Sequence, residues 1–224
     1  MTLAQWQVSR RCGSVCRVSG VRHGTLGAAS ADRMGDSMSV AVLEHPEPWS
    51  EEEFFALGET PNRVELVDGS LWVSPAPSKR HQHIAFLLAM GLYGAAERAG
   101  LLVLQDVNLR LAGGRILQPD VLVADTDDAG TTVEAAETKL VVEVVSPSNA
   151  GTDRLLKPQL YAAAGIGWYL RVEQPHDSVE LHLQQLERDH YSTVVIASPE
   201  QVLACEEPFP FRLEVASLLR RRTA

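Results

Sequence analysis

The chain has 224 residues, 45% hydrophobic and 22% charged, which is typical of a globular protein with one core or two small ones. This composition excludes a collagen, a coiled coil and a disordered chain, and no apolar stretch approaches the roughly 18–20 residues that cross a bilayer. Residues 1–37 carry five Arg against two Asp, whereas residues 38–224 carry 15 Lys and Arg against 27 Asp and Glu. The larger, acidic part is therefore not expected to offer a broad nucleic-acid surface without metal ions or a local basic patch.

The first 37 residues differ in composition from the rest of the chain. They are rich in Ser, Gly, Ala and Arg and lack the periodicity of a helix or a strand, so we expect residues 1–37 to be a disordered N-terminal extension, with the native start at Met34 or Met38. They also lack the apolar block of about 7–15 residues of a signal peptide, so we expect a cytoplasmic protein. The chain's three cysteines are an odd number, which predicts no disulfide framework.

Residues 38–224 are expected to form a single domain that begins with helical signals. Ser50 and Glu53 have the spacing of a capping box, which predicts a short helix after Ser50. Apolar residues then recur at helical spacing over 79–98, after a Pro-rich connection. Ser78 can cap the start of this long helix.

A β-hairpin is predicted between these two helices. Asp68-Gly69 separates two apolar runs and accepts the positive φ angles of a type I′ turn. The two-residue turn places Glu65 opposite Trp72. Both then lie on the face away from the predicted core side, which is formed by Val64, Leu66, Leu71 and Val73.

The remainder of the chain reads mainly as strands. They are predicted at 101–109, at 116–124 with an interruption at Pro119-Asp120, and at 140–145, 168–173, 178–184 and 191–197. Residues 125–138 are predicted to form an acidic loop and 152–164 a second helix. A Pro-rich segment at 208–211 is predicted to lead to a short C-terminal helix. This order predicts an α/β (α+β) fold, with a central sheet on which helices pack.

Two acidic side chains interrupt apolar runs. Glu143 lies within Leu140–Val145, a run typical of a strand covered on both faces. A buried carboxylate needs a cation, a hydrogen-bond network or a metal, whereas on an edge strand Glu143 would simply face solvent. Asp120 opens a second apolar run, although Pro-Asp is also a common turn pair. Such carboxylates are ligands that Mg²⁺ prefers, and Glu65 is a third candidate.

Basic residues near these carboxylates have functional and structural interpretations. Lys157 follows Asp153 by four residues, so it either forms a surface ion pair or places an ammonium beside a metal and a phosphate. We expect it to stay protonated and to lower the pKa of Glu143. Lys79, Arg80 and His81 open the long helix, where His81 could contact a substrate phosphate. His81 and His83 point about 200° apart on a helix, so they are not expected to share a metal.

Taken in order, several short motifs resemble the Uma2 family, a branch of the PD-(D/E)XK nuclease superfamily. The resemblance covers about residues 45–215, and its specificity comes from the ordered set rather than from any single motif. The motifs are Glu65-Leu-Val-Asp-Gly69, Ser74-Pro-Ala-Pro-Ser78, Arg80-His81-Gln82, Gln118-Pro-Asp120, Val142-Glu-Val-Val-Ser-Pro-Ser148, Asp153, Lys157, Leu160-Tyr161 and Ala164-Gly165-Ile166.

This resemblance implies a restriction-endonuclease-like core, a central mixed β-sheet flanked by helices. It implies cleavage of DNA phosphodiesters with Mg²⁺, for which Mn²⁺ can substitute, and Asp120 and Glu143 as metal ligands with Glu65 as an extra one. In the superfamily a lysine stands two residues after the second acid, where this chain has Val145. The resemblance assigns that role to Lys157, although the following Pro158 requires the helix to begin nearby or to be kinked.

Three functional hypotheses follow. The first is a Mg²⁺-dependent endodeoxyribonuclease in which Asp120, Glu143 and Lys157 are catalytic. The second is a catalytically weak or inactive module that keeps the nuclease fold and acts through DNA or protein binding. The third is a structural protein in which a buried Glu143 simply pairs with Lys157. DNA is the expected partner and no membrane is expected. A homodimer is left open as an alternative to a monomer.

Overall fold

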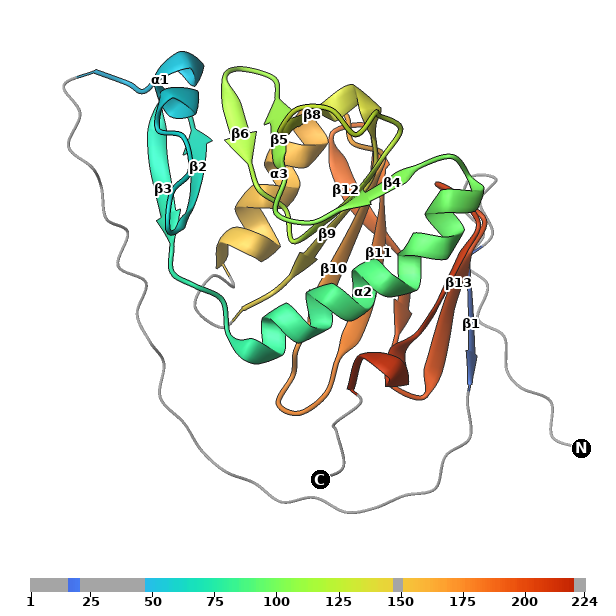
Figure 1. Ribbon diagram of the computed structural model, residues 1–224. Helices are drawn as coiled ribbons and strands as arrows, with labels where there is room; N and C mark the ends of the chain where they lie inside the picture. Colours follow the sequence, from blue (N-terminus) through green and yellow to red (C-terminus); the bar gives the residue numbers. More distant parts are fainter. Residues whose placement is uncertain (1–15, 21–46, 147–150, 220–224) are drawn as a thin grey trace, which may run out of the picture.

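The computed structural model describes residues 16–20, 47–146 and 151–219. Its centre is a six-stranded sheet with the order β12-β11-β10-β9-β7-β4 (Figure 1). Strands β9 and β10 run parallel, and the other neighbouring pairs run antiparallel, so the sheet is mixed, as predicted. Its strands are β4 (Leu102–Leu104), β7 (Val121–Ala124), β9 (Thr138–Val144), β10 (Trp168–Glu173), β11 (Glu180–Glu187) and β12 (His190–Ala197).

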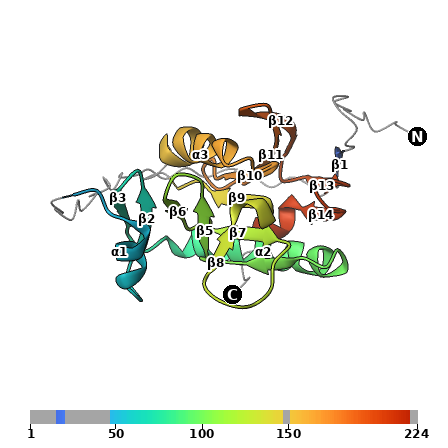
Figure 2. The same ribbon diagram turned by 90° about the horizontal axis from the view of Figure 1, so that it is seen from above.

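Helices cover both faces of the central sheet (Figure 2). Helix α2 (Lys79–Arg98) lies on one face, where Leu88 belongs to the same core cluster as Val142 of β9. Helix α3 (Lys157–Ala163) lies on the other face, where Tyr161 clusters with Val141. Successive residues of β9 therefore enter different cores, which explains why its apolar run does not alternate. No helix in the described ranges is long and apolar enough to cross a membrane.

A five-stranded sheet with the order β3-β2-β6-β5-β8 packs beside α3 and carries the short helix α1 (Glu51–Ala56). Its strands are β2 (Arg63–Val67), β3 (Ser70–Ser74), β5 (Asn108–Leu111), β6 (Arg115–Leu117) and β8 (Thr132–Glu134), the last followed by the 3₁₀ turn η1 (Ala135–Glu137).

A third sheet, with the order β1-β13-β14, packs near α2. Its strands are β1 (Cys16–Gly20), β13 (Gln201–Cys205) and β14 (Phe211–Glu214). The 3₁₀ helix η3 (Val215–Leu219) follows β14.

The hairpin and both helix caps form as predicted. Glu65 pairs with Trp72 across β2 and β3, and Asp68 and Gly69 both have positive φ, at 49° and 76°. The Ser50 side chain accepts the backbone N–H of Glu53 in a capping box. The predicted core side of the hairpin lies in one apolar cluster with Phe54 of α1.

Other segments differ from the prediction, mainly because their strands are too short to show a clear local periodicity. The strand expected at 101–109 is broken by Asp106, whose φ is 51°, into β4 and the beginning of β5. The predicted loop 125–138 contains β8, which pairs in parallel with β5. Strands β13 and β14 were not predicted, and they pair with each other where a Pro-rich connection and a helix were expected. Local periodicity does not reveal such pairings in strands of three to five residues.

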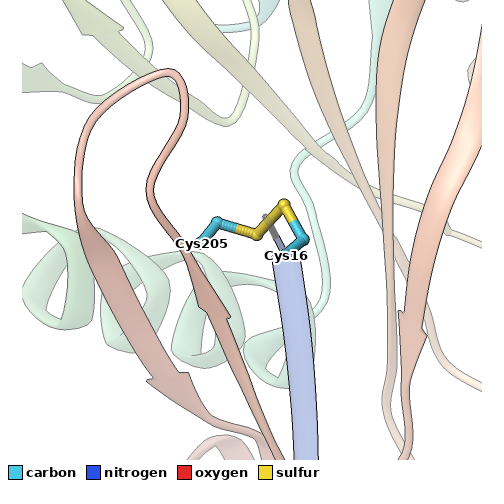
Figure 3. The surroundings of a disulfide bond; sticks show 2 residues. All are labelled: Cys16 and Cys205. Carbon is cyan, nitrogen blue, oxygen red and sulfur yellow. A yellow bond between two sulfur atoms is a disulfide. The ribbon is translucent and has the colours of Figure 1, made fainter. Parts of the chain in front are cut away.

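The expectation of a disordered extension over 1–37 is wrong for Cys16–Gly20, which form β1 and pair antiparallel with β13. The predicted starts Met34 and Met38 lie outside the described residues. The prediction from the cysteine count is also wrong, since Cys16 and Cys205 form a disulfide between residues 189 positions apart (Figure 3). Both cysteines are buried in the core cluster that includes α2. An odd cysteine count leaves one residue over but does not prevent a pair.

This disulfide predicts a specific cross-linked peptide. Tryptic digestion without reduction should release residues 12–17 joined to residues 189–212, because the described strands hold Cys16 next to Cys205. Tandem mass spectrometry should place the link at Cys16, and reduction should separate the two peptides. Cys205→Ser is the matched control and should release residues 12–17 alone. A free Cys205 thiol in the purified, unreduced protein would contradict the assignment.

Candidate metal centre

Four carboxyl groups and one lysine converge where β2 of the five-stranded sheet approaches β9 of the central sheet. Each of the five side chains belongs to a residue that is at most 5% exposed. They come from four elements of the fold and from the residue that precedes β7. The residues are Glu65 of β2, Asp120, Glu143 of β9, Asp153 of the π-helical turn Thr152–Leu156, and Lys157 of α3.

Glu143 occupies an interior strand, because β9 lies between β7 and β10. The alternative of an edge-strand glutamate facing solvent is therefore wrong. Its Oε1 accepts hydrogen bonds from the Lys157 ammonium at 3.0 Å and from the Tyr161 hydroxyl at 2.6 Å. A buried carboxylate is stable only with such partners, so Glu143 has the ion pair and the donor that its position requires.

Asp120 is held by three donors from three different elements. Its Oδ1 accepts from the Arg63 guanidinium at 2.9 Å and lies 3.1 Å from Nε2 of His81. Its Oδ2 accepts the backbone N–H of Val144 at 2.7 Å, which fixes it beside the residue that follows Glu143. The Pro119-Asp120 pair lies between β6 and β7. Besides connecting these strands, it places the Asp120 carboxylate against the backbone of β9.

Lys157 lies within ion-pair distance of three carboxylates. Its Nζ is 3.0 Å from Glu143, 3.4 Å from Oε1 of Glu65 and 3.9 Å from Asp153. The interpretation as a surface ion pair with Asp153 is therefore wrong, since both residues are buried. Glu65 faces the same space as Glu143, and its Oε1 also accepts the backbone N–H of Gln118 at 2.8 Å.

The position of Lys157 depends on how the helix accommodates Pro158. Residues Thr152–Leu156 form a π-helical turn, and the α-helix begins only at Lys157, so Pro158 lies in the first turn of α3. A proline is tolerated there because the first amides of a helix have no intrahelical acceptor. The wider π-turn thus makes the proline compatible with a lysine that reaches Glu143.

The charges of this centre do not balance. Its four carboxylates are accompanied by two permanent cations, Lys157 and Arg63, and Arg63 also pairs with the more exposed Asp106. If all four carboxyl groups were ionised, two negative charges would remain beyond those balanced by Lys157 and Arg63, or one when His81 beside Asp120 is protonated. A buried excess of this size favours either protonation or the binding of a divalent cation.

The pKa values follow from this imbalance. Burial raises the pKa of Glu143 to about 8, with added repulsion from nearby carboxylates, although Lys157 opposes the rise. Burial likewise raises the pKa of Asp153 to about 6. Burial disfavours ionised Asp120 too, but His81 and Arg63 outweigh it, and its pKa lies well below the ordinary value. Lys157 lowers the pKa of Glu143, as predicted, but burial is the larger effect and the net direction is upward.

The donor set fits a hard divalent cation. All ligand candidates are carboxylate oxygens, and the described polar contacts of Glu65 and Glu143 involve Oε1 alone. Their Oε2 atoms can therefore contribute to ligation. Within the ranges that the structure describes, no three His, Cys, Asp or Glu side chains are already arranged around a metal position. The Lys157 ammonium lies within ion-pair distance of both glutamates.

Some residues of the centre were not identified by sequence reasoning, and two predicted neighbours lie elsewhere. Arg63 and Tyr161 were missed, although Tyr161 follows Lys157 by four residues and so shares its helix face. His81 contacts Asp120 directly. Arg80 instead donates to the carbonyl of Ser178 and pairs with Asp177, and Lys79 is exposed.

Comparison with known proteins gives a consistent result. Residues 51–218 match the model of the Uma2 family, which is described as "Putative restriction endonuclease". A crystal structure titled as a putative nuclease belonging to DUF820 from Anabaena variabilis ATCC 29413 has the same fold. It aligns with a TM-score of 0.60 and 15% identity, over 77% of this chain and 98% of that chain.

No curated protein matches the sequence. The family match nevertheless spans most of the described chain, including all five residues of the candidate centre. The fold likeness agrees with the restriction-endonuclease-like core implied by the motifs. This chain belongs to the Uma2 family.

Proposed function

We propose that this chain is a Mg²⁺-dependent endonuclease that hydrolyses phosphodiester bonds in DNA. The observation that carries the proposal is the buried group of four carboxylates, three of them within 3.9 Å of Lys157, whose charge excess a divalent cation would neutralise. Family membership and the shared fold support a nuclease rather than another hydrolase. With DNA as substrate, we also propose that the protein acts in the cytoplasm.

Each residue has a distinct role in this proposal. Asp120, Glu143 and Glu65 would hold Mg²⁺, which when bound supplies Lewis-acid activation of the phosphate and of the attacking water. Arg63 and the Val144 amide fix the Asp120 carboxylate in one orientation. The Lys157 ammonium provides positive charge where negative charge develops on the phosphate, and burial strengthens this effect.

Two other hypotheses make different predictions for the same protein. The observed pair of Lys157 with Glu143 at 3.0 Å is also what a purely structural role requires. A nuclease-fold module without catalysis would bind DNA and leave it intact. Plasmid incubated with the protein and Mg²⁺ or Mn²⁺, and in parallel with EDTA, separates these hypotheses. Metal-dependent nicking supports the nuclease, whereas intact plasmid at all metal concentrations would contradict it.

Lys157→Met should separate catalysis from metal binding. Methionine keeps much of the buried side-chain volume but removes the charge, so plasmid cleavage should fall by about 100-fold or more. Binding of Mn²⁺ should persist or tighten, because the carboxylates lose their competing cation. Lys157→Arg should restore little activity, since a planar fork replaces a compact ammonium.

The control for Lys157→Met is a charge removal outside the centre, such as Lys139→Met, where Lys139 pairs with the exposed Asp125. It should leave both cleavage and Mn²⁺ binding unchanged. Circular dichroism should confirm that both variants are folded. Full cleavage activity in Lys157→Met would show that the lysine is only an ion-pair partner and would remove its catalytic role.

Metal affinity should depend on pH through Glu143. Its pKa of about 8 means that the metal-free side chain is protonated below that pH and must lose its proton to become a ligand. The Mn²⁺ dissociation constant should therefore decrease about tenfold per pH unit from pH 6 towards pH 8 and level off above it. Calorimetric titrations at pH 6, 7, 8 and 9 measure this dependence.

Glu143→Gln tests the assignment of that titration. The amide cannot ionise, so the variant should bind Mn²⁺ more weakly at pH 8 and lose most of the pH dependence, and it should not cleave plasmid. Glu97→Gln, on the exposed surface of α2, is the matched control and should behave like the unmodified protein. If the Mn²⁺ dissociation constant changed equally with pH in the unmodified protein and in Glu143→Gln, another group would set the pH dependence.

A further inference from the structure

The outer side of helix α2 carries a stripe of exposed apolar side chains. Phe86, Met90 and Tyr93 are four and three residues apart, so they lie on one face of the helix. Their exposed fractions are 53%, 60% and 55%. Scattered apolar residues are ordinary on a protein surface, whereas large ones that gather on one face mark an interaction site.

The opposite side of α2 is already covered by the rest of the fold. Leu88, Leu92 and Ala96 are fully buried and belong to the core cluster that α2 shares with the central sheet. From residue 84 to residue 96 the helix has no charged side chain on any side. A surface helix normally carries polar residues on its outer side, and a helix that is apolar all round is normally buried. The outer side of α2 therefore has the composition of an interface.

The stripe is symmetric about its middle, which favours a second copy of this chain as the partner. Met90 lies at the middle, with the rings of Phe86 and Tyr93 about one helical turn to either side. The exposed residues His83 and Glu97 lie seven positions before and after Met90, or about 10 Å along the helix axis. A two-fold interface requires such a self-complementary surface.

An antiparallel pair of α2 helices uses this symmetry. With the two-fold axis at Met90, Phe86 of each copy lies beside Tyr93 of the other. His83 of each copy then lies opposite Glu97 of the other, so an imidazole meets a carboxylate at both ends of the stripe. A parallel pair would instead bring the two Glu97 carboxylates together, which is unfavourable.

The area of the stripe sets the expected strength of the pair. At roughly 200 Å² for a large side chain, the three apolar residues expose on the order of 300 Å² on each copy. A pair would bury about twice that area through the stripe alone, and the polar residues at its ends bring the total towards the lower limit of about 1,200 Å² for specific interfaces. The pair is therefore expected to be reversible, with a dissociation constant in the micromolar range.

We propose that two copies of this chain form a two-fold dimer through the outer side of α2, with the helices antiparallel and Met90 at the axis. The proposal goes beyond the proposed nuclease activity and does not depend on it, because Phe86, Met90 and Tyr93 are not residues of the metal centre.

Sedimentation equilibrium of the full chain between about 1 and 100 μM tests the dimer. The average mass should rise with concentration from that of one chain towards that of two. Met90→Glu places two like charges at the axis and should raise the dissociation constant about 100-fold or more. Ile196→Glu, at another exposed apolar position on β12, is the matched control and should dimerise like the unmodified chain.

Cysteine cross-linking tests the arrangement. All cross-linking variants carry Cys12→Ser, so that the introduced cysteine is the only one besides Cys16 and Cys205. Under mild oxidation Met90→Cys should form a disulfide-linked dimer, because the two copies of this position face each other across the axis. Ile196→Cys should remain unlinked. Phe86→Cys and Tyr93→Cys should link to each other when mixed, in higher yield than either variant links to itself.

The outcomes separate this dimer from other assemblies. Circular dichroism should confirm that Met90→Glu is folded, and the cross-linking result stands even if it is not. A chain that remains monomeric at 100 μM would overturn the proposal. A dimer that Ile196→Glu disrupts and Met90→Glu leaves intact would also overturn it, since the interface would then lie at β12. Plasmid cleavage bears on the metal centre alone, so failure of either proposal is distinguishable from failure of the other.

Discussion

The burial of one ammonium group governs the arrangement of this protein's centre. Lys157 is 5% exposed, and a buried cation is stable only if it is surrounded by anions. Glu65, Glu143 and Asp153 supply them, and they come from separate elements of the fold. The cluster therefore links α3 and the preceding π-helical turn to both large sheets. Removing one partner of such a group typically costs about 3–5 kcal/mol, so its members constrain the fold as well as any chemistry.

Within this cluster, the carboxyl groups of Asp120 and Glu143 have very different pKa values. Asp120 receives hydrogen bonds and positive charge from three sides and remains ionised. Glu143 is buried among other carboxylates, and burial raises its pKa to about 8. Environments that separate the pKa values of adjacent acids are characteristic of functional sites. A fold that needed only stability could have placed apolar residues here, as buried ion pairs are often replaceable in that way.

The residues that were predictable from sequence are those with a strong local signal. Glu143 and Asp120 stand out because each interrupts an apolar run, and Glu65 follows from the geometry of an Asp-Gly turn. Arg63 carries no such signal, since an arginine at the start of a strand is ordinary. Arg63 joins the centre only in the folded chain, where its guanidinium donates to the carboxylate of Asp120, 57 residues away in the sequence. Strand β1 was missed for the same reason, because it is defined by a partner strand near the other end of the chain.

The bond between Cys16 and Cys205 also has a mechanical consequence. Every residue of the candidate centre lies within the loop of chain that this bond closes. A force that pulls on the chain from either end passes through the covalent link, from β1 directly to β13, and does not reach the segment between them. Mechanical unfolding by a force on the two ends of the chain would therefore stop at Cys16 from the N-terminal side and at Cys205 from the C-terminal side. As long as the bond is intact, the centre can be opened by heat or denaturant but not by stretching the ends of the chain.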